Sequence, residues 1–222
     1  MSFFFQQMML AITRTFPTIA ATSHGNNSTT QTTSDVVSFP TGTVSGDMVL
    51  LTFSVENTTS ITTPTNFTLL DAVRTYPSIT GAIGIFYGTA VSGSATVSHG
   101  LGRASWAVLR ITGYSGVPSI SGPGSSAAST APNSPSLTPG LTLPYLWLSI
   151  AGIEASGAQT YSFSAVPAFF TESVQETGVT TVSSSAIDVA YRQFSTATQN
   201  PAAFTSSPSA SWVAWTLAIT PA

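Results

Sequence analysis

Two nearly identical segments lie about a hundred residues apart in this chain. "ASWAVLRIT" occupies residues 104–112, and "ASWVAWTLAIT" occupies residues 210–220. Both are rich in Val, Ile, Leu, Trp and Thr with partly alternating polarity, which is typical of a β-strand. A chain that contains the same strand twice needs similar neighbouring strands for both copies.

Three further segments recur in the same order and with similar spacing. Each again has the composition of a strand or of the turn before one. The chain is therefore internally duplicated, over roughly residues 35–115 and 134–222. The matched pairs are 46–56 with 143–154, 63–70 with 165–172 (with Pro64 and Pro167 in register), and 82–88 with 186–192 (with Tyr87 and Tyr191 in register).

Clusters of Gly, Pro, Asn and Ser separate these segments. Short strands at regular intervals between turn-forming residues are typical of β-sandwiches and barrels. We therefore predict an all-β fold, an antiparallel and jelly-roll-like β-sandwich built from two repeated halves, with an apolar N-terminal arm. Whether the halves share one core or form two remains open at this point.

The regions outside the repeat are polar or rich in turn formers, as loops and extended connectors are. We predict four parts: an N-terminal arm and polar tether at 1–34, a first β half at 35–115, a Gly/Ser/Pro-rich connector at 116–133, and a second β half at 134–222.

The first sixteen residues, "MSFFFQQMMLAITRTF", are largely apolar. A signal peptide would carry basic residues before its apolar core, and none precedes Phe3, although a cleaved leader is the alternative. The run is also shorter than the ~20 residues of a membrane span. We interpret it as an arm that anchors the protein to a partner, through Phe3, Phe4, Phe5, Met8, Met9 and Leu10.

Charge is scarce along the whole sequence. Only 6% of the 222 residues are charged, against about 25% in a typical soluble domain. There is no lysine, the five arginines are scattered, and the net charge is −3. This pattern argues against a nucleic-acid-binding surface. A surface of hydroxyls and amides suits a protein packed among neighbours or exposed outside the cell.

No catalytic or metal-binding motif is present. The two histidines, His24 in the tether and His99 in a turn, are predicted to be solvated, and the eight acidic residues form no recognisable pair. The four tryptophans lie in strand patterns and are predicted to be core residues, whereas Tyr76 and Tyr114 stand in turn-like segments and are candidates for exposed contacts. We therefore expect no enzyme activity, no metal and no cofactor.

The chain resembles a family of β-rich proteins found in tailed bacteriophages and some bacteria. The resemblance covers about residues 35–222 and rests on "FPTGTVSGDMVLLTFSVE", "TTPTNFTLLD", "GIFYGTA", "ASWAVLRITG" and the corresponding segments of the second half. Asn66 and Phe67 stand where the family usually has Gly-Trp. The shared motifs are structural, so the resemblance carries no catalytic residue to this chain.

This resemblance implies an accessory protein of the virus particle, commonly a trimer of sandwich subunits. The apolar arm favours a capsid decoration (cement) protein on the outer capsid surface, bound to the major capsid protein and to its own copies as a homotrimer. A tail-fibre or adhesin module that binds host-surface carbohydrate is the alternative. Neither a nucleic-acid nor a membrane partner is expected.

Overall fold

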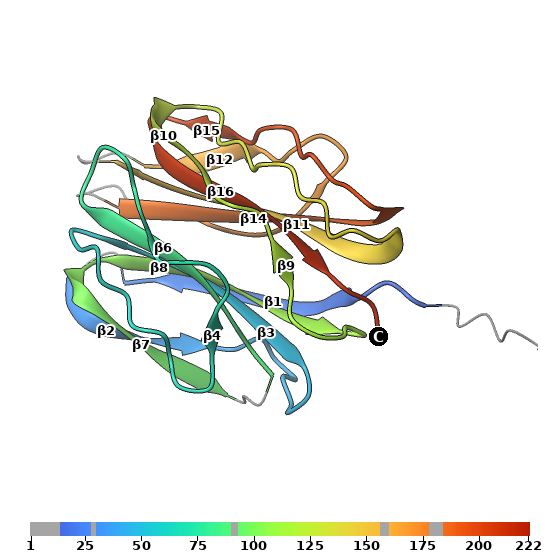
Figure 1. Ribbon diagram of the computed structural model, residues 1–222. Coiled ribbons are helices and arrows are strands. Elements are labelled where there is room, and N and C mark those ends of the chain that lie inside the picture. The colour runs from blue at the N-terminus through green and yellow to red at the C-terminus, as the bar shows by residue number, and fades with distance from the viewer. Residues whose placement is uncertain (1–13, 28–29, 90–92, 156–159, 178–183) are drawn as a thin grey trace, which may run out of the picture.

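The computed structural model describes residues 14–27, 30–89, 93–155, 160–177 and 184–222. Within these residues the chain forms β-strands and no helix (Figure 1). The strands of the first half are β1 (Thr18–Asn26), β2 (Thr32–Ser38), β3 (Met48–Glu56), β4 (Thr68–Leu69), β5 (Arg74–Thr75), β6 (Gly81–Gly88), β7 (Ser94–Gly102) and β8 (Ala104–Thr112). Those that follow are β9 (Ser119–Ile120), β10 (Gly124–Ser129), β11 (Leu143–Ala155), β12 (Ser162–Ala165), β13 (Thr171–Glu176), β14 (Ser184–Thr196), β15 (Thr205–Ser207) and β16 (Ala210–Ile219).

Two six-stranded antiparallel sheets form the body of the protein. The first has the order β1-β8-β3-β6-β4, with β5 also paired to β6, and the second has the order β10-β16-β11-β14-β13, with β9 also paired to β16. Figure 1 shows the two sheets stacked, with the pair β2–β7 beyond the first and the pair β12–β15 beyond the second. The fold is thus an antiparallel β-sandwich with an extra strand pair on each outer side.

The main paths of the two sheets have the same strand order. The repeated segments at 104–112 and 210–220 form β8 and β16. Each is the second strand of its sheet: β8 lies between β1 and β3, and β16 lies between β10 and β11. On the other side, β6 pairs with β3 as β14 pairs with β11. The prediction of a sandwich made of two similar halves is confirmed.

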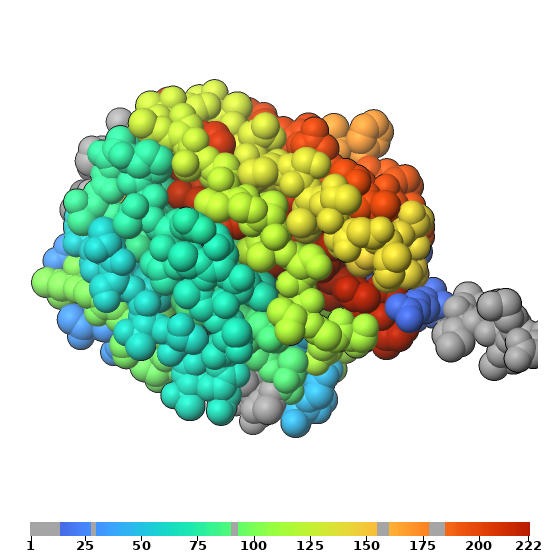
Figure 2. All heavy atoms as spheres, in the orientation of Figure 1, coloured from blue at the N-terminus to red at the C-terminus, as the bar shows by residue number. Residues whose placement is uncertain are grey.

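The halves share one core, and each also has a core of its own. The facing sides of the two sheets form the shared core, from Leu50, Ile85 and Leu109 on one sheet to Leu148 and Leu217 on the other. The opposite side of each sheet packs under its own outer strand pair, in a second and a third cluster. Because a strand alternates its side chains between faces, strands buried on both faces read as continuous apolar runs. In Figure 2 the halves accordingly form one continuous body.

The tryptophans lie in these cores, as predicted, although not to the same degree. Trp147, Trp212 and Trp215 are buried. Trp106 is half-buried, and its ring stacks on Phe53 with the two ring centroids 6.1 Å apart. Gly25 of β1 lies beside it, and a Cβ there would stand 2.8 Å from the indole. A larger residue at position 25 of β1 would therefore clash with the ring of Trp106.

Two segments predicted as unpacked prove to contain strands. The predicted arm and tether, 1–34, contains β1 and the first residues of β2, and the connector contains β9 and β10. β1 pairs along its length with β8, and β10 pairs with β16. Both lie at sheet edges, where backbone hydrogen bonds to one neighbour suffice and an exposed face tolerates Ser, Thr and Asn. The repeat therefore begins with β1 in the first half and with β10 in the second.

The predicted apolar arm, Phe3 to Leu10, lies outside the described residues. Among the residues that are described, no helix is long and apolar enough to cross a membrane.

Candidate functional site

His99, predicted to be a solvated turn residue, is instead a buried residue of β7. Its Nε2 lies 2.8 Å from Oδ2 of Asp35, and its Nδ1 lies 2.7 Å from the carbonyl oxygen of Gly100. Asn27 donates to both carboxylate oxygens of Asp35 at 2.9 Å. Both ring nitrogens therefore contact groups of the fold. This pair holds β2 against β7 and serves a structural purpose.

His24 also has a partner, on the other sheet. Its Nδ1 lies 2.5 Å from Oε2 of Glu176, and Asn26 donates to Oε1 of the same carboxylate at 2.5 Å. The side chain of His24 is 54% exposed, whereas that of Glu176 is buried. The contact joins β1 of the first sheet to β13 of the second, so it ties the halves together at one side.

Two glutamates occupy matching places in the repeat, and both are buried. Glu56 ends β3 opposite Gly81, and Glu154 lies near the end of β11 opposite Ser185. Arg103 donates to Glu56 through Nη1 at 2.6 Å, whereas no basic residue pairs with Glu154 in the described part of the chain. Burial first, and the charge of Glu56 second, raises the pKa of Glu154 to about 9. A carboxyl in this position is neutral at pH 7.

These buried carboxyls do not form a catalytic pair. Glu56 and Glu154 are at most 2% exposed, so a substrate does not reach them. Tyr76, predicted to be an exposed contact, is buried beside them, with its hydroxyl 2.8 Å from that of Ser54. Within the described residues, no group of three His, Asp or Glu side chains is placed to hold a metal ion.

The most unusual surface feature is a cluster that we call the aromatic–arginine patch, formed by Phe169, Arg192 and Phe194. Phe169 is 85% exposed and Phe194 is 42% exposed. The guanidinium carbon of Arg192 lies 4.0 Å from the ring centroid of Phe194 and 5.6 Å from that of Phe169. Cation–π attraction therefore holds three otherwise mobile side chains together.

A tight turn presents Phe169 to solvent. The amide of Phe170 donates to the carbonyl of Pro167 at 3.0 Å, and Phe169 has a φ of 67°. The first half makes the same turn, in which Phe67 donates to Pro64 at 3.1 Å and Asn66 has a φ of 66°. Asparagine tolerates left-handed backbone, but a bulky side chain there is a genuine outlier.

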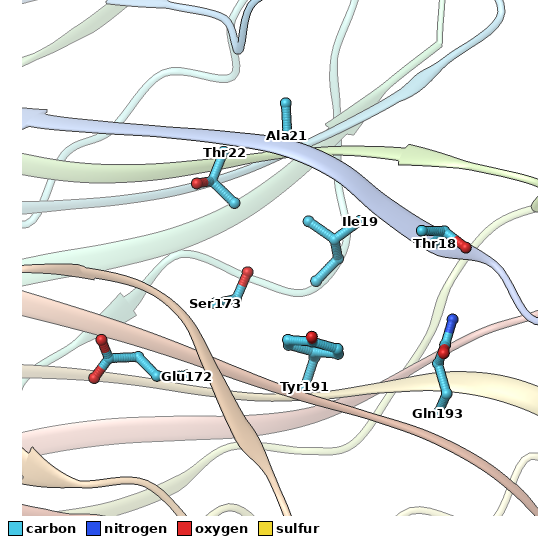
Figure 3. Close-up of a pocket in the computed structure, with 8 residues that line it drawn as sticks. All are labelled: Thr18, Ile19, Ala21, Thr22, Glu172, Ser173, Tyr191 and Gln193. Atoms are coloured by element: carbon cyan, nitrogen blue, oxygen red, sulfur yellow. The ribbon is translucent and has the colours of Figure 1, made fainter.

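A groove lies on the opposite face of β14 from the patch. It has a volume of about 310 Å³ and runs between β1 of the first sheet and β13–β14 of the second (Figure 3). Most of its side chains carry hydroxyl, amide or carboxylate groups. The lining residues are Thr18, Ile19, Ala21, Thr22, Glu172, Ser173, Tyr191 and Gln193.

Sequence reasoning did not single out the aromatic–arginine patch. The signal was nevertheless present, because aligning Pro64 with Pro167 places Phe169 opposite Asn66. Tyr114, the other predicted contact, is only partly exposed and packs against the shared core.

No protein-family model, no curated protein and no solved structure matches this chain.

Proposed function

We propose that this protein is a non-enzymatic structural component of a bacteriophage particle, a decoration protein of the outer capsid surface. It binds the major capsid protein and its own copies, and self-association produces a homotrimer. The resemblance described above supports an accessory protein of the virus particle, and the apolar arm favours the outer capsid surface.

The observation that carries the non-enzymatic part of the proposal is the use made of the ionisable side chains. Both histidines are bound to carboxylates that join strands or sheets. Glu56, Glu154 and Asp188 are buried and face apolar surroundings or structural partners. Catalysis requires a nucleophile or base that reaches a substrate, whereas these groups are buried or paired with another side chain of the fold.

Attachment in this proposal depends on apolar burial. Removing apolar surface from water stabilises a contact by roughly 25 cal/mol per Å², and repetition over a symmetric shell multiplies modest contacts through avidity. The apolar arm, from Phe3 to Leu10, supplies such surface. Among the described residues, the three cores are formed by residues beyond position 16, so we expect the folded part to form without the arm.

The test is the location of the protein in purified particles. Mass spectrometry of empty capsids and of detached tails should find it with the capsids, and finding it in the tails alone would contradict the proposal. A variant that lacks residues 1–16 should fold and yet fail to join particles. Normal incorporation of that variant would show that the arm is not the anchor.

A further inference from the structure

The aromatic–arginine patch contains a cation that the fold leaves unpaired. All eight acidic residues lie in the described part of the chain, and none has an oxygen within 4.0 Å of Arg192. Three other arginines, at 74, 103 and 110, each pair with a carboxylate. Arg192 instead contacts two phenyl rings.

This contact leaves the hydrogen-bonding groups of Arg192 available. A guanidinium that stacks on an aromatic ring uses its face, while its N–H donors lie in its plane and point to the side. Those donors match the two oxygens of a carboxylate. Phe169 and Phe194 therefore hold Arg192 in a fixed place with a free anion-binding edge.

The exposure of Phe169 is not a requirement of the fold. The equivalent turn of the first half is made with Asn66, and the residue that follows the equivalent tyrosine there is Gly88, where the second half has Arg192. The same architecture is thus built without a ring or a cation at these positions. A strained residue that the fold does not need is a sign of function.

We propose that the aromatic–arginine patch binds a saccharide that carries a carboxylate, such as a hexuronic acid. Arg192 pairs with the carboxylate, and the exposed ring of Phe169 stacks on the apolar face of the sugar. The two rings beside the cation favour a sugar over an acidic protein segment. Phe169 is 85% exposed and Phe194 is 42% exposed, and a hexuronic acid carries an apolar ring face and a carboxylate on one small group.

This inference goes beyond the decoration role and does not rest on it, because the patch is a property of the isolated protein. A protein that binds no saccharide could still be found on capsids, and a protein absent from capsids could still bind a saccharide, so the two tests fail separately.

The experiment uses the whole purified chain and tetragalacturonate, with the methyl ester of the same tetrasaccharide as the uncharged control. Calorimetric titration at low ionic strength should detect binding of tetragalacturonate and at least about tenfold weaker binding of the ester, because a charge-assisted pair contributes on that scale. Absence of binding, or equal binding of acid and ester, overturns the proposal.

Two variants and a matched control locate the site. Arg192→Gln removes the charge, and Phe169→Asn introduces the residue found at the equivalent turn of the first half; each should weaken acid binding about tenfold. Val36→Asn is the control, since Val36 is also an exposed apolar residue, 64% exposed, but lies on β2 of the first half. Binding that survives both patch variants overturns the assignment.

A peptide of four glutamates separates sugar recognition from simple carboxylate binding. The proposal requires tetragalacturonate to bind more tightly than this peptide, and tighter binding of the peptide would contradict it. Thermal unfolding of each variant confirms that it remains folded.

Discussion

Glu154→Gln should make the stability of this protein much less sensitive to alkaline pH. Glu154 is 2% exposed, and its Oε2 makes no hydrogen bond. Gly81 on the facing sheet has no side chain, and this absence creates the space for the carboxyl, because a Cβ there would clash with it. Burial, together with the charge of Glu56, raises the pKa of Glu154 from 4.5 to about 9.

The sign follows from the protons bound in each state. Between pH 4.5 and 9 the folded protein keeps the proton on Glu154, whereas the unfolded chain releases it. The free energy of unfolding therefore falls as pH rises through this window. The slope is about 1.4 kcal/mol for each pH unit, which amounts to about 4 kcal/mol between pH 5 and pH 8. A neutral glutamine at this position removes that slope.

The assay is urea unfolding of wild type and Glu154→Gln at pH 5, 6, 7, 7.5 and 8.5. Asp188→Asn is the matched control, because burial and the charge of Glu172 raise the pKa of Asp188 only to about 7. That variant should flatten the curve below pH 7 and leave it unchanged above.

The window from pH 7.5 to 8.5 therefore isolates Glu154. Between pH 7.5 and 8.5 the free energy of unfolding of the wild type should fall by about 1.4 kcal/mol relative to that of Glu154→Gln. A difference between the two free energies of unfolding that does not change with pH reflects only how well the glutamine amide packs in place of the carboxyl. Parallel curves across this window would refute the claim that Glu154 is protonated in the folded state.

Three more outcomes are expected. Phe169→Asn should raise the free energy of unfolding by about 1 kcal/mol by relieving left-handed strain, and Asn66→Phe should lower it by a similar amount; chemical denaturation measures both, and a loss of stability in the first variant would contradict the strain argument. Trp212→Ala should cost about 3–5 kcal/mol, and Trp106→Ala should cost less because Trp106 is only half-buried; the same assay ranks them, and the opposite order would be inconsistent with the burial of the two rings. Particle-bound protein should stay bound in 1 M sodium chloride, where ion pairs are screened within about 3 Å, and should detach in guanidinium chloride; sedimentation followed by quantification of the supernatant checks this, and full release by salt alone would rule out apolar attachment.

The strands that the sequence predicts best are those buried on both faces. β3, β11 and β16 are continuous apolar runs, and their recurrence identified the repeat. β1 was missed because its stability comes from backbone pairing with β8 and not from a pattern of apolar side chains. Its exposed and half-buried residues alternate, but Thr, Ser and His on such a strand are indistinguishable from a loop by composition.

The polar contacts were harder to predict, because their partners are distant in sequence. Asp35 lies 64 residues before His99, and Glu176 lies 152 residues after His24. Nothing near either histidine indicates a carboxylate. Tyr76 shows the same limit, since its turn-like neighbours suggested exposure while the second sheet covers it. Gly152 of that sheet has no side chain, and a Cβ there would lie 2.6 Å from the tyrosine hydroxyl.

Because the chain contains its fold twice, each half is a control for the other. In the first half the matching glutamate, Glu56, pairs with Arg103 on the neighbouring strand, whereas the residue opposite Glu154 on β16 is Ser211. This buried difference has an effect inside the molecule, because Glu154 remains without a basic partner and keeps its proton. The exchange of Gly88 for Arg192 has no such effect, since no carboxylate of this chain meets the added charge. A cation that contacts two exposed rings and no carboxylate of its own chain is best explained by an anionic ligand outside the molecule.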